Sequence, residues 1–280
     1  MKRILLFLSI CLHLHATDQS NKIVIDYHDW YQEAPECRKG NFNAQYVLSK
    51  YEKIVEGRNC VYYPAKNPKR MVISFSYAVF GAYAMWSWFW KDTEDWDDTA
   101  YLFLRDDMIT WYVGTKTAPS ILMFKSIIDH FLSLSGLTYD KCFSMGSSAG
   151  GYGALLYAIA LGFKGAMVEV PTFDKDLWNY AVGWEQIRPD FQWVDLSILL
   201  KHVTKFPHIS VQYGNWPGDM LCCGKMVDVL RETKCPFTVW RTSMPNHYTA
   251  MNKAFIEKEI AHIERQVDLD TMVPAQYRKN

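Results

Sequence analysis

A serine flanked by glycines is the clearest candidate for chemistry in this sequence. Residues 141–153 contain the pattern Gly146-x-Ser148-x-Gly150. The pattern is typical of a nucleophile elbow, a tight turn between a strand and a helix that exposes a serine hydroxyl. Ser147 lacks glycine on both sides at this spacing, so Ser148 is the predicted nucleophile. A glycine-rich loop that ends a buried strand is the alternative.

A serine hydroxyl becomes a good nucleophile when a neighbouring base takes its proton. In this architecture an acid and then a histidine follow the serine in the chain, each on a loop after a later strand. Asp219 fits the acid, because it follows a predicted strand over 208–213 across the loop 214–218. A turn or helix-capping residue is the alternative for Asp219. The other acid candidates are Asp174, Asp176, Asp190, Asp195 and Asp228.

His247 is the predicted base. It follows a predicted strand over 236–241 and precedes a charged amphipathic helix predicted over 250–266. A histidine on a surface loop is the alternative. The other histidines downstream of the serine are less well placed, because they fall within helices or at a strand start; they are His202, His208 and His262.

Acyl transfer also needs two backbone N–H donors for the developing oxyanion. Ala149 directly follows the nucleophile at the start of a predicted helix, whose dipole favours negative charge there. The second donor is expected in the loop after the predicted strand 71–76, at Ser76 or Tyr77.

Strands alternate with helices around these residues. This alternation predicts a mostly parallel sheet with helices on both faces. The predicted strands cover 23–27, 71–76, 99–106, 141–147, 165–170, 208–213 and 236–241. The predicted helices cover 46–55, 120–132 with Ser120 as N-cap and Gly136 as stop, 149–160, 223–230 and 250–266.

Two aromatic-rich segments interrupt the alternation. Residues 77–96 contain four tryptophans and are expected to form a helix or cap over the sheet. Residues 171–205 are irregular and are the place where a cap could be inserted. We expect residues 17–280 to form a single domain that includes this segment.

The first residues resemble a signal peptide. Lys2 and Arg3 precede an apolar run over 4–14, and the small residue Ala16 follows. This order predicts export after cleavage near residue 16, to the periplasm or the exterior. A buried first strand in a cytoplasmic protein is the alternative. No other stretch approaches the roughly 18 apolar residues of a membrane span.

Charge and cysteine spacing exclude other classes of site. The formal net charge is zero and no basic stripe is present, so nucleic acid is not an expected partner. No CxxC or paired Cys/His spacing predicts a metal site, and no cofactor is expected. The cysteines allow a bridge between Cys37 and Cys60, and another between Cys235 and either Cys222 or Cys223.

Three motifs together resemble a known family. They are a strand ending in Arg105-Asp106, the turn Trp111-Tyr112 with Gly114, and the elbow Gly146–Leu156. Over roughly residues 70–250, the chain resembles a branch of the α/β-hydrolase superfamily that occurs with bacterial capsule and surface-glycan biosynthesis. This branch includes capsular polysaccharide biosynthesis proteins and an accessory secretion protein that acetylates glycans.

The resemblance implies an α/β-hydrolase fold with Ser148, Asp219 and His247 as a catalytic triad. It also implies ester chemistry on a glycan or glycoprotein. Our hypothesis is therefore a serine esterase or acyltransferase that acts on a small-molecule or glycan ester. The alternative is a non-catalytic accessory or glycan-binding protein on the same scaffold, which would use the aromatic segments 77–96 and 178–193.

Overall fold

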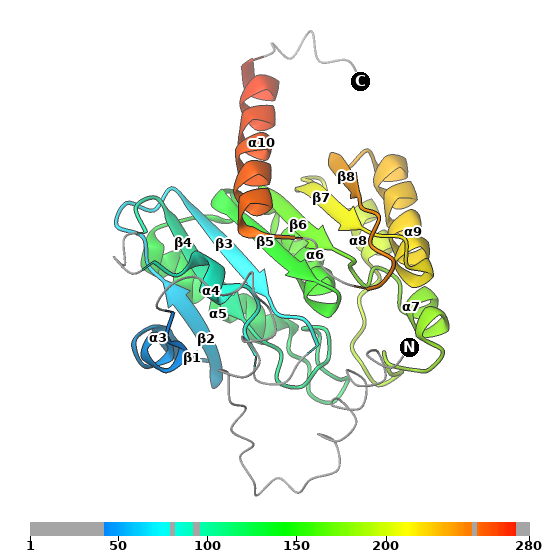
Figure 1. The fold of residues 1–280 in the computed structure, drawn as a ribbon, viewed down its shortest axis with the longest axis horizontal. Helices are drawn as coiled ribbons and strands as arrows, with labels where there is room; N and C mark the ends of the chain where they lie inside the picture. The colour runs from blue at the N-terminus through cyan, green and yellow to red at the C-terminus, as the bar shows by residue number, and fades with distance from the viewer. Residues whose placement is uncertain (1–41, 79–81, 92–95, 248–250, 273–280) are drawn as a thin grey trace, which may run out of the picture.

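The computed structural model describes residues 42–78, 82–91, 96–247 and 251–272, with side chains up to residue 266 (Figure 1). The predicted signal peptide and the strand predicted over 23–27 lie outside these residues. Cys37 also lies outside them, and with it the bridge that the sequence allowed between Cys37 and Cys60.

The described residues build one eight-stranded sheet in the order β1-β2-β4-β3-β5-β6-β7-β8. Strand β2 pairs antiparallel with both β1 and β4, and all other neighbours are parallel. The strands are β1 (Glu52–Val55), β2 (Arg58–Tyr63), β3 (Arg70–Phe75), β4 (Thr99–Leu104), β5 (Cys142–Ser147), β6 (Gly165–Glu169), β7 (His208–Tyr213) and β8 (Phe237–Arg241). The predicted, mostly parallel sheet is confirmed.

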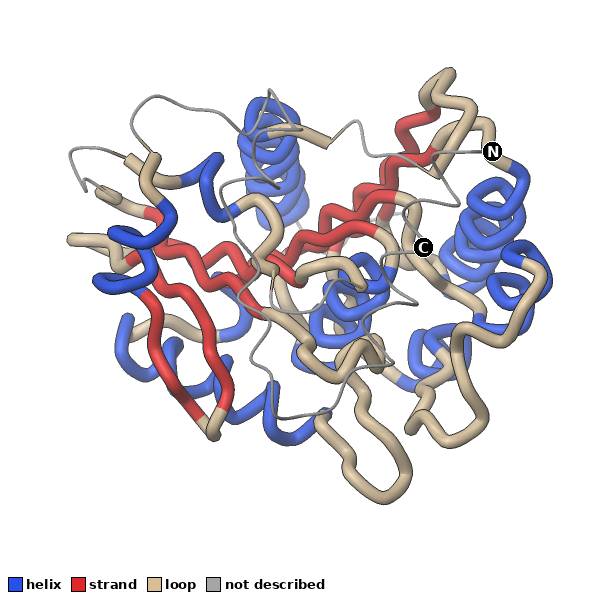
Figure 2. Tube along the Cα trace, turned by 60° about the horizontal axis from the view of Figure 1, so that its bottom comes forward, coloured by secondary structure: helices blue, strands red, loops and turns tan. Residues whose placement is uncertain are grey.

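Helices cover both faces of this twisted sheet (Figures 1 and 2). They are α3 (Ala44–Tyr51), α4 (Trp86–Phe89), α5 (Ile121–Ser135), α6 (Ala149–Leu161), α7 (Lys175–Val182), α8 (Leu196–His202), α9 (Pro217–Thr233) and α10 (Lys253–Met272), with a 3-10 turn at Tyr139–Lys141. None of the helices in the described residues is long and apolar enough to cross a membrane.

The core has two halves because successive side chains of a strand point to opposite faces. On β3, Ile73 packs in the cluster with α5, α6, α8 and α9, whereas Val72 packs in the cluster with α3, α4 and α10. The tryptophans Trp86, Trp88 and Trp96 of the predicted cap are buried in this second cluster. They therefore contribute to the core on that face, and the short helix α4 lies in the segment where a helix or cap was expected.

The helix predicted over 46–55 is wrong at its end. Helix α3 stops at Tyr51, and the next four residues form β1. A tight turn joins β1 to β2, with positive φ at Glu56 (52°) and at Gly57 (69°). Glycine adopts this conformation without a steric penalty, so the hairpin forms where helical spacing alone predicted more helix.

Three other helix ends can be compared with the local sequence signals that predicted them. Gly136 closes α5 in the left-handed conformation and donates to Leu132 and Ser133, as predicted for a stop. Ser120 occupies the N-cap position, but its side chain makes no capping hydrogen bond. Helix α9 begins at Pro217, earlier than the predicted residue 223, because proline suits the first turn of a helix.

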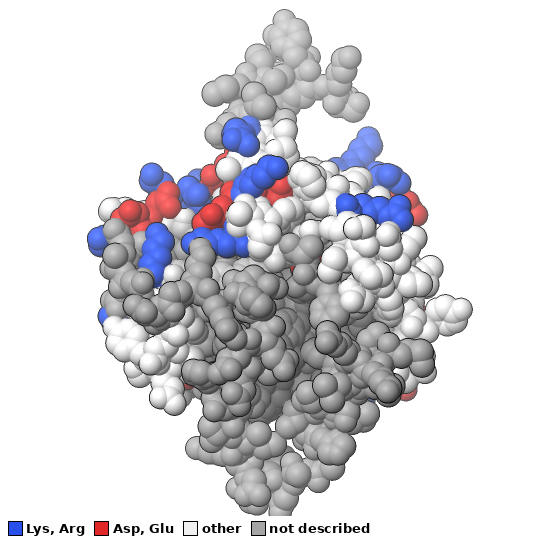
Figure 3. Space-filling view, viewed as in Figure 1, with Lys and Arg blue, Asp and Glu red and all other residues white. Residues whose placement is uncertain are grey.

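The segment 171–205 carries α7 and α8. Helix α7 packs against α9, and α8 packs against α9 and α6. On the described part of the face drawn in Figure 3, basic and acidic side chains are interspersed. The visible described surface therefore carries no large patch of one charge.

The bridge that the sequence allowed between Cys235 and either Cys222 or Cys223 is not formed. All three are free and buried. The thiol of Cys222 donates to the backbone carbonyl of Asp174, and the thiol of Cys235 donates to that of Pro207 at 3.4 Å.

The buried thiols are expected to be unreactive in the native protein. Burial raises the pKa of Cys60, Cys142, Cys222 and Cys235 to about 12. Because the thiolate is the reactive form, these four thiols should stay unalkylated in native protein at pH 8. In denatured protein all four should be alkylated. Differential alkylation followed by peptide mapping measures this; modification of Cys222 in native protein would contradict the buried position.

Candidate active site

Ser148 lies in a strained turn between β5 and α6. Its backbone has φ 54° and ψ −121°, a conformation that non-glycine residues adopt only when the surrounding structure enforces it. The flanking glycines explain why the turn is possible. A Cβ on Gly146 would lie 2.3 Å from the carbonyl oxygen of Gly150, and a Cβ on Gly150 would lie 2.1 Å from that of Phe75.

The structure brings the three predicted residues together. The Nε2 atom of His247 lies 3.0 Å from the Oγ of Ser148, and its Nδ1 lies 2.6 Å from the Oδ1 of Asp219. The neutral tautomer with its proton on Nδ1 donates to Asp219 and accepts from the serine hydroxyl. The imidazole is thus in place to take a proton from Ser148 while a carboxylate orients it.

Asp219 lies in the first turn of α9 and is 1% exposed. Its Oδ2 is buried without a hydrogen-bond partner among the described residues. Burial raises the pKa of Asp219, and its hydrogen bond and attraction to His247 oppose this only in part. The carboxylate is therefore held in a position that costs folding free energy, a common property of functional sites.

The Asp219→Asn variant tests this cost. A raised folded pKa means that the wild-type protein loses stability as pH rises above the ordinary value of 3.8, and the loss is complete above the folded pKa. Asparagine does not ionise, so the Tm of the variant relative to wild type should rise between pH 3.5 and pH 7. Thermal unfolding across this range, with the exposed Asp228→Asn on the same helix as a control, measures the difference.

A decrease in the relative Tm of Asp219→Asn over this pH range would show that the charged carboxylate stabilises the fold. The control residue Asp228 is 79% exposed in its side chain and pairs with Arg231 on the surface. Its replacement should leave the pH dependence of Tm unchanged, because surface ion pairs contribute little.

Two indole rings flank His247. The ring centroids of Trp178 and Trp216 lie 4.9 and 5.4 Å from that of the imidazole. Trp178 comes from α7, and Trp216 precedes α9 directly. Together they limit the positions open to the imidazole, whose side chain is 27% exposed. The sequence marked the segment of Trp178 as aromatic but not that of Trp216, and no local signal indicated that these two rings would meet the histidine.

The predicted oxyanion donors lie on two neighbouring elements. Ala149 is the first residue of α6, where a backbone N–H has no acceptor within the helix. The N–H of Ser76 donates to the carbonyl of Leu104 at 3.1 Å, which leaves Tyr77 as the candidate for the second donor. A small pocket joins these elements; it is lined by Ser76, Tyr77, Ala78, Asp106, Ile109, Trp111, Tyr112 and Ala149.

The other predicted acids have structural contacts elsewhere. Asp174 and Asp195 cap α7 and α8 through backbone N–H groups. Asp190 pairs with Arg188, and Asp228 with Arg231. Asp176 is exposed in the first turn of α7 and lies 3.9 Å from Lys175. Of the candidate acids in the described residues, Asp219 is the one hydrogen-bonded to His247.

The other histidines also contact residues away from Ser148. His202 bonds the carbonyl of Ile198 within α8. The Nε2 of His208 lies 2.9 Å from the hydroxyl of Thr238, and its ring makes a T-shaped contact with that of His262. In the described residues, no group of His, Cys, Asp and Glu could hold a metal ion.

Known proteins were compared with the chain as a whole. No known family description matches the sequence, and no curated protein sequence matches it. The solved capsule O-acetyltransferase of Neisseria meningitidis serogroup A is similar, with a TM-score of 0.52 and 14% identity, over 78% of this chain and 92% of that chain. The acylaminoacyl peptidase of Pyrococcus horikoshii is similar with a TM-score of 0.56 and 11% identity, over 74% of this chain and 39% of that chain.

The glycosylation-associated Gap123 complex of Streptococcus agalactiae is also similar, with a TM-score of 0.50 and 14% identity, over 78% of this chain and 46% of that chain. At these identities the likeness concerns the fold alone. Together with the sheet order, it shows that this chain has the α/β-hydrolase fold. The fold predicted from the sequence is confirmed.

Proposed function

We propose that this protein is a serine esterase or acyltransferase that works through an acyl-enzyme on Ser148. One observation carries the proposal: His247 lies between Ser148 and Asp219, at 3.0 Å from the hydroxyl and 2.6 Å from the carboxylate. The neighbours in fold are a capsule O-acetyltransferase and peptidases, which supports an enzyme of the transferase or hydrolase kind.

Acylation begins when the Nε2 of His247 takes the proton of Ser148. The serine Oγ then attacks the ester carbonyl carbon, and the carbonyl oxygen becomes an oxyanion that the N–H of Ala149 stabilises. Asp219 stabilises the imidazolium that forms. When the tetrahedral intermediate collapses, the C–O bond to the alcohol breaks and His247 gives its proton to the leaving oxygen.

Deacylation repeats these steps with a new acceptor. His247 takes a proton from water or from a sugar hydroxyl, and the resulting oxygen nucleophile attacks the acyl-enzyme. Water gives net hydrolysis, whereas a hydroxyl of a second substrate gives acyl transfer.

An acylated surface glycan is the substrate class that we propose. The sequence motifs resemble proteins of surface-glycan biosynthesis, and one neighbour in fold is titled a capsule O-acetyltransferase. Near the buried Trp178, Tyr180 and Trp184 have exposed fractions of 79% and 45%. Aromatic side chains with exposed faces suit contacts with sugar rings.

These exposed rings also support the second candidate, a non-catalytic glycan-binding protein on a hydrolase scaffold. Binding would need Tyr180 and Trp184 but not the hydroxyl of Ser148. Glycan binding that is lost in the double variant Tyr180→Ala/Trp184→Ala and kept in Ser148→Ala, with no turnover by wild type, would favour this candidate.

An assay of purified protein with p-nitrophenyl acetate and a panel of acetylated sugars tests the proposal. We expect release of p-nitrophenol, and faster release when a sugar acceptor competes successfully with water. If wild type shows no turnover of any ester in this set above that of the Ser148→Ala variant, the proposed ester chemistry is wrong.

A further inference from the structure

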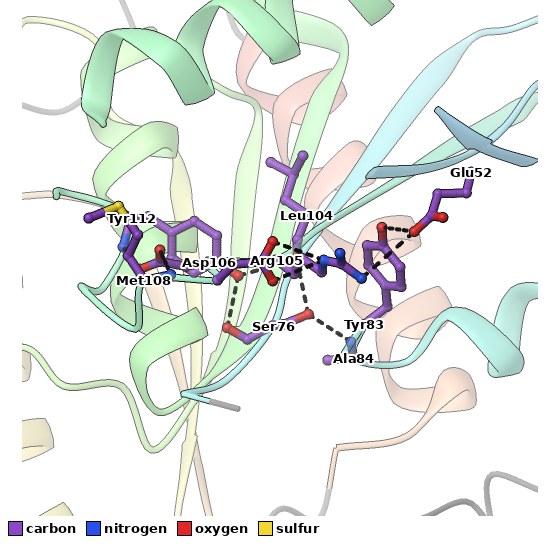
Figure 4. Close-up of polar contacts among 10 residues, drawn as sticks. Glu52, Ser76, Tyr83, Ala84, Leu104, Arg105, Asp106, Met108 and Tyr112 are labelled. Atoms are coloured by element: carbon purple, nitrogen blue, oxygen red, sulfur yellow. Dashed lines mark hydrogen bonds and ion pairs between the residues drawn. The ribbon is translucent and has the colours of Figure 1, made fainter. Parts of the chain in front are cut away.

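Ser76, the residue directly after β3, is hydrogen-bonded to the last residue of β4 (Figure 4). The backbone N–H and the Oγ of Ser76 lie 3.1 and 3.0 Å from the carbonyl oxygen of Leu104, to which both donate. The same Oγ accepts a hydrogen bond from the N–H of Ala84 at 2.8 Å. We name residues 76–78 the oxyanion loop, because they carry the second candidate donor, Tyr77.

A second anchor holds the chain just before Ala84. The hydroxyl of Tyr83 donates to the carboxylate of Glu52 on β1 at 2.7 Å. The guanidinium of Arg105 lies over the Tyr83 ring at 5.0 Å and pairs with Glu52 at 3.7 Å. The segment that begins with the oxyanion loop is therefore fixed to the sheet at both ends.

Tyr112 contacts the oxyanion loop from the other side. The Tyr112 side chain is 1% exposed, and its hydroxyl donates to the carbonyl of Ser76 at 2.9 Å. The carbonyl of Leu104 lies 3.2 Å from the same hydroxyl. Burial raises the pKa of Tyr112 well above its ordinary value, so the phenol remains a donor at neutral and mildly alkaline pH.

Asp106 builds the turn that presents Tyr112. Its Oδ2 accepts hydrogen bonds from the N–H of Tyr112 at 2.9 Å and from the N–H of Thr110 at 2.6 Å. Within this turn Ile109, Trp111 and Tyr112 have positive φ values of 52°, 55° and 65°. Three strained non-glycine residues in one short turn persist only where the surroundings enforce them, and such strain clusters at functional sites.

The nucleophile helix α6 packs directly on this assembly. A Cβ on Gly153 would lie 2.7 Å from the Tyr112 ring, and one on Gly150 would lie 2.8 Å from the carbonyl oxygen of Ser76. The small pocket is lined by both Ala149 and Tyr112. The hydroxyl of Tyr112 therefore acts where the helix that carries one oxyanion donor meets the loop that carries the other.

We propose that Tyr112, held by Asp106, is a positioning residue that sets the oxyanion loop against Ala149. The inference rests on the proposed function, since it concerns how that reaction's oxyanion site is formed. Without the bond to the Ser76 carbonyl, the loop can shift, and the two N–H donors no longer converge on one oxygen atom. Substrate contacts outside this loop remain.

The Tyr112→Phe variant tests the proposal, because it removes only the hydroxyl and keeps the ring. We expect kcat for p-nitrophenyl acetate to fall by about tenfold to a hundredfold with KM within about twofold, since misplaced oxyanion donors affect the transition state. The maximal rate of fluorophosphonate labelling at Ser148 should fall similarly. Asp106→Asn should give the same split between kcat and KM.

Tyr63→Phe is the matched control. Tyr63 is fully buried on β2 and donates to the carbonyl of Trp86 at 3.2 Å, away from Ser148. It should lower Tm as much as Tyr112→Phe does and leave kcat unchanged. If Tyr112→Phe does not fold, Asp106→Asn is the second variant, because it weakens the carboxylate contacts to the N–H groups of Thr110 and Tyr112 that hold Tyr112 in place.

The possible outcomes distinguish failure of the Tyr112 positioning role from failure of the proposed function. Wild type that labels at Ser148, together with a folded Tyr112→Phe that matches Tyr63→Phe in kcat and labelling rate, overturns the positioning role alone. If Tyr112→Phe does not fold, a folded Asp106→Asn variant with unchanged kcat overturns it equally. Wild type that does not label at Ser148 overturns the proposed function, and the positioning role with it.

Discussion

Replacing Ser148 with alanine is expected to lower kcat/KM for p-nitrophenyl acetate by a factor on the order of 10⁴ to 10⁶. The variant keeps the turn and the pocket but has no oxygen to form the acyl-enzyme. Residual activity would come from water activated by His247 and from the oxyanion donors. Steady-state kinetics of the purified variant measure the loss.

Ser147→Ala is the control for this prediction. Ser147 is the last residue of β5 and is 3% exposed, and it pairs in the sheet with Glu169. Its hydroxyl makes no hydrogen bond that would couple it to His247 in the described structure. The Ser147→Ala variant should retain wild-type kcat within about twofold; a loss comparable to that of Ser148→Ala would mean that the nucleophile was wrongly assigned.

Replacing Gly150 with alanine is expected to destabilise the fold by at least about 3 kcal/mol or to prevent folding. The new Cβ would lie 2.1 Å from the carbonyl oxygen of Phe75 and 2.8 Å from that of Ser76. Both atoms belong to backbone at the end of β3, so relief requires α6 to move away from the sheet. Chemical denaturation, with soluble yield as a second readout, measures the effect.

Gly224→Ala is the matched control, because Gly224 also lies inside a helix but a Cβ there would meet nothing within 4 Å. Alanine favours helix over glycine, so this variant should gain about 0.5–1 kcal/mol. If Gly150→Ala were as stable as wild type, the close approach between α6 and β3 would be wrong. Comparing the two variants separates the destabilising effect of a clash with β3 from the stabilising effect of alanine's higher helix propensity.

The sequence predicted that Ser148, Asp219 and His247 would lie close together because each of them has a local signal. The elbow depends on glycines at fixed spacing, and Asp219 and His247 each follow a strand whose apolar run is easily recognised. The carboxyl ends of parallel strands meet at one edge of the sheet, so the order along the chain was enough to predict that these residues converge. The structure brings them within hydrogen-bonding distance.

Features that depend on contacts between distant residues could not be predicted. Nothing near Trp178 or Trp216 in the sequence indicates that both rings would face one histidine. The hydrogen bond from Ser76 to Leu104 depends on the pairing of β3 with β4, which the sequence did not specify. Strand β1 was missed because its short half-buried pattern continues the helical spacing of α3.

The Arg-Asp strand end and the Trp-Tyr turn could be recognised in the sequence, but the roles of their side chains could not be predicted. In the sequence both motifs only support the resemblance to a family. The structure shows Asp106 bonded to the backbone of the turn and Tyr112 bonded to Ser76. Contacts between residues distant in the sequence therefore explain why these motifs occur together.

If Ser148 is a nucleophile activated by His247, a fluorophosphonate should label it. The probe forms a bond between its phosphorus and an activated serine oxygen, and fluoride leaves. Labelling of the purified protein followed by peptide mapping should give a single phosphonylated site at Ser148 in wild type, and no labelling in His247→Ala. Absence of labelling in folded wild-type protein, or labelling at another serine, would show that Ser148 is not the activated nucleophile.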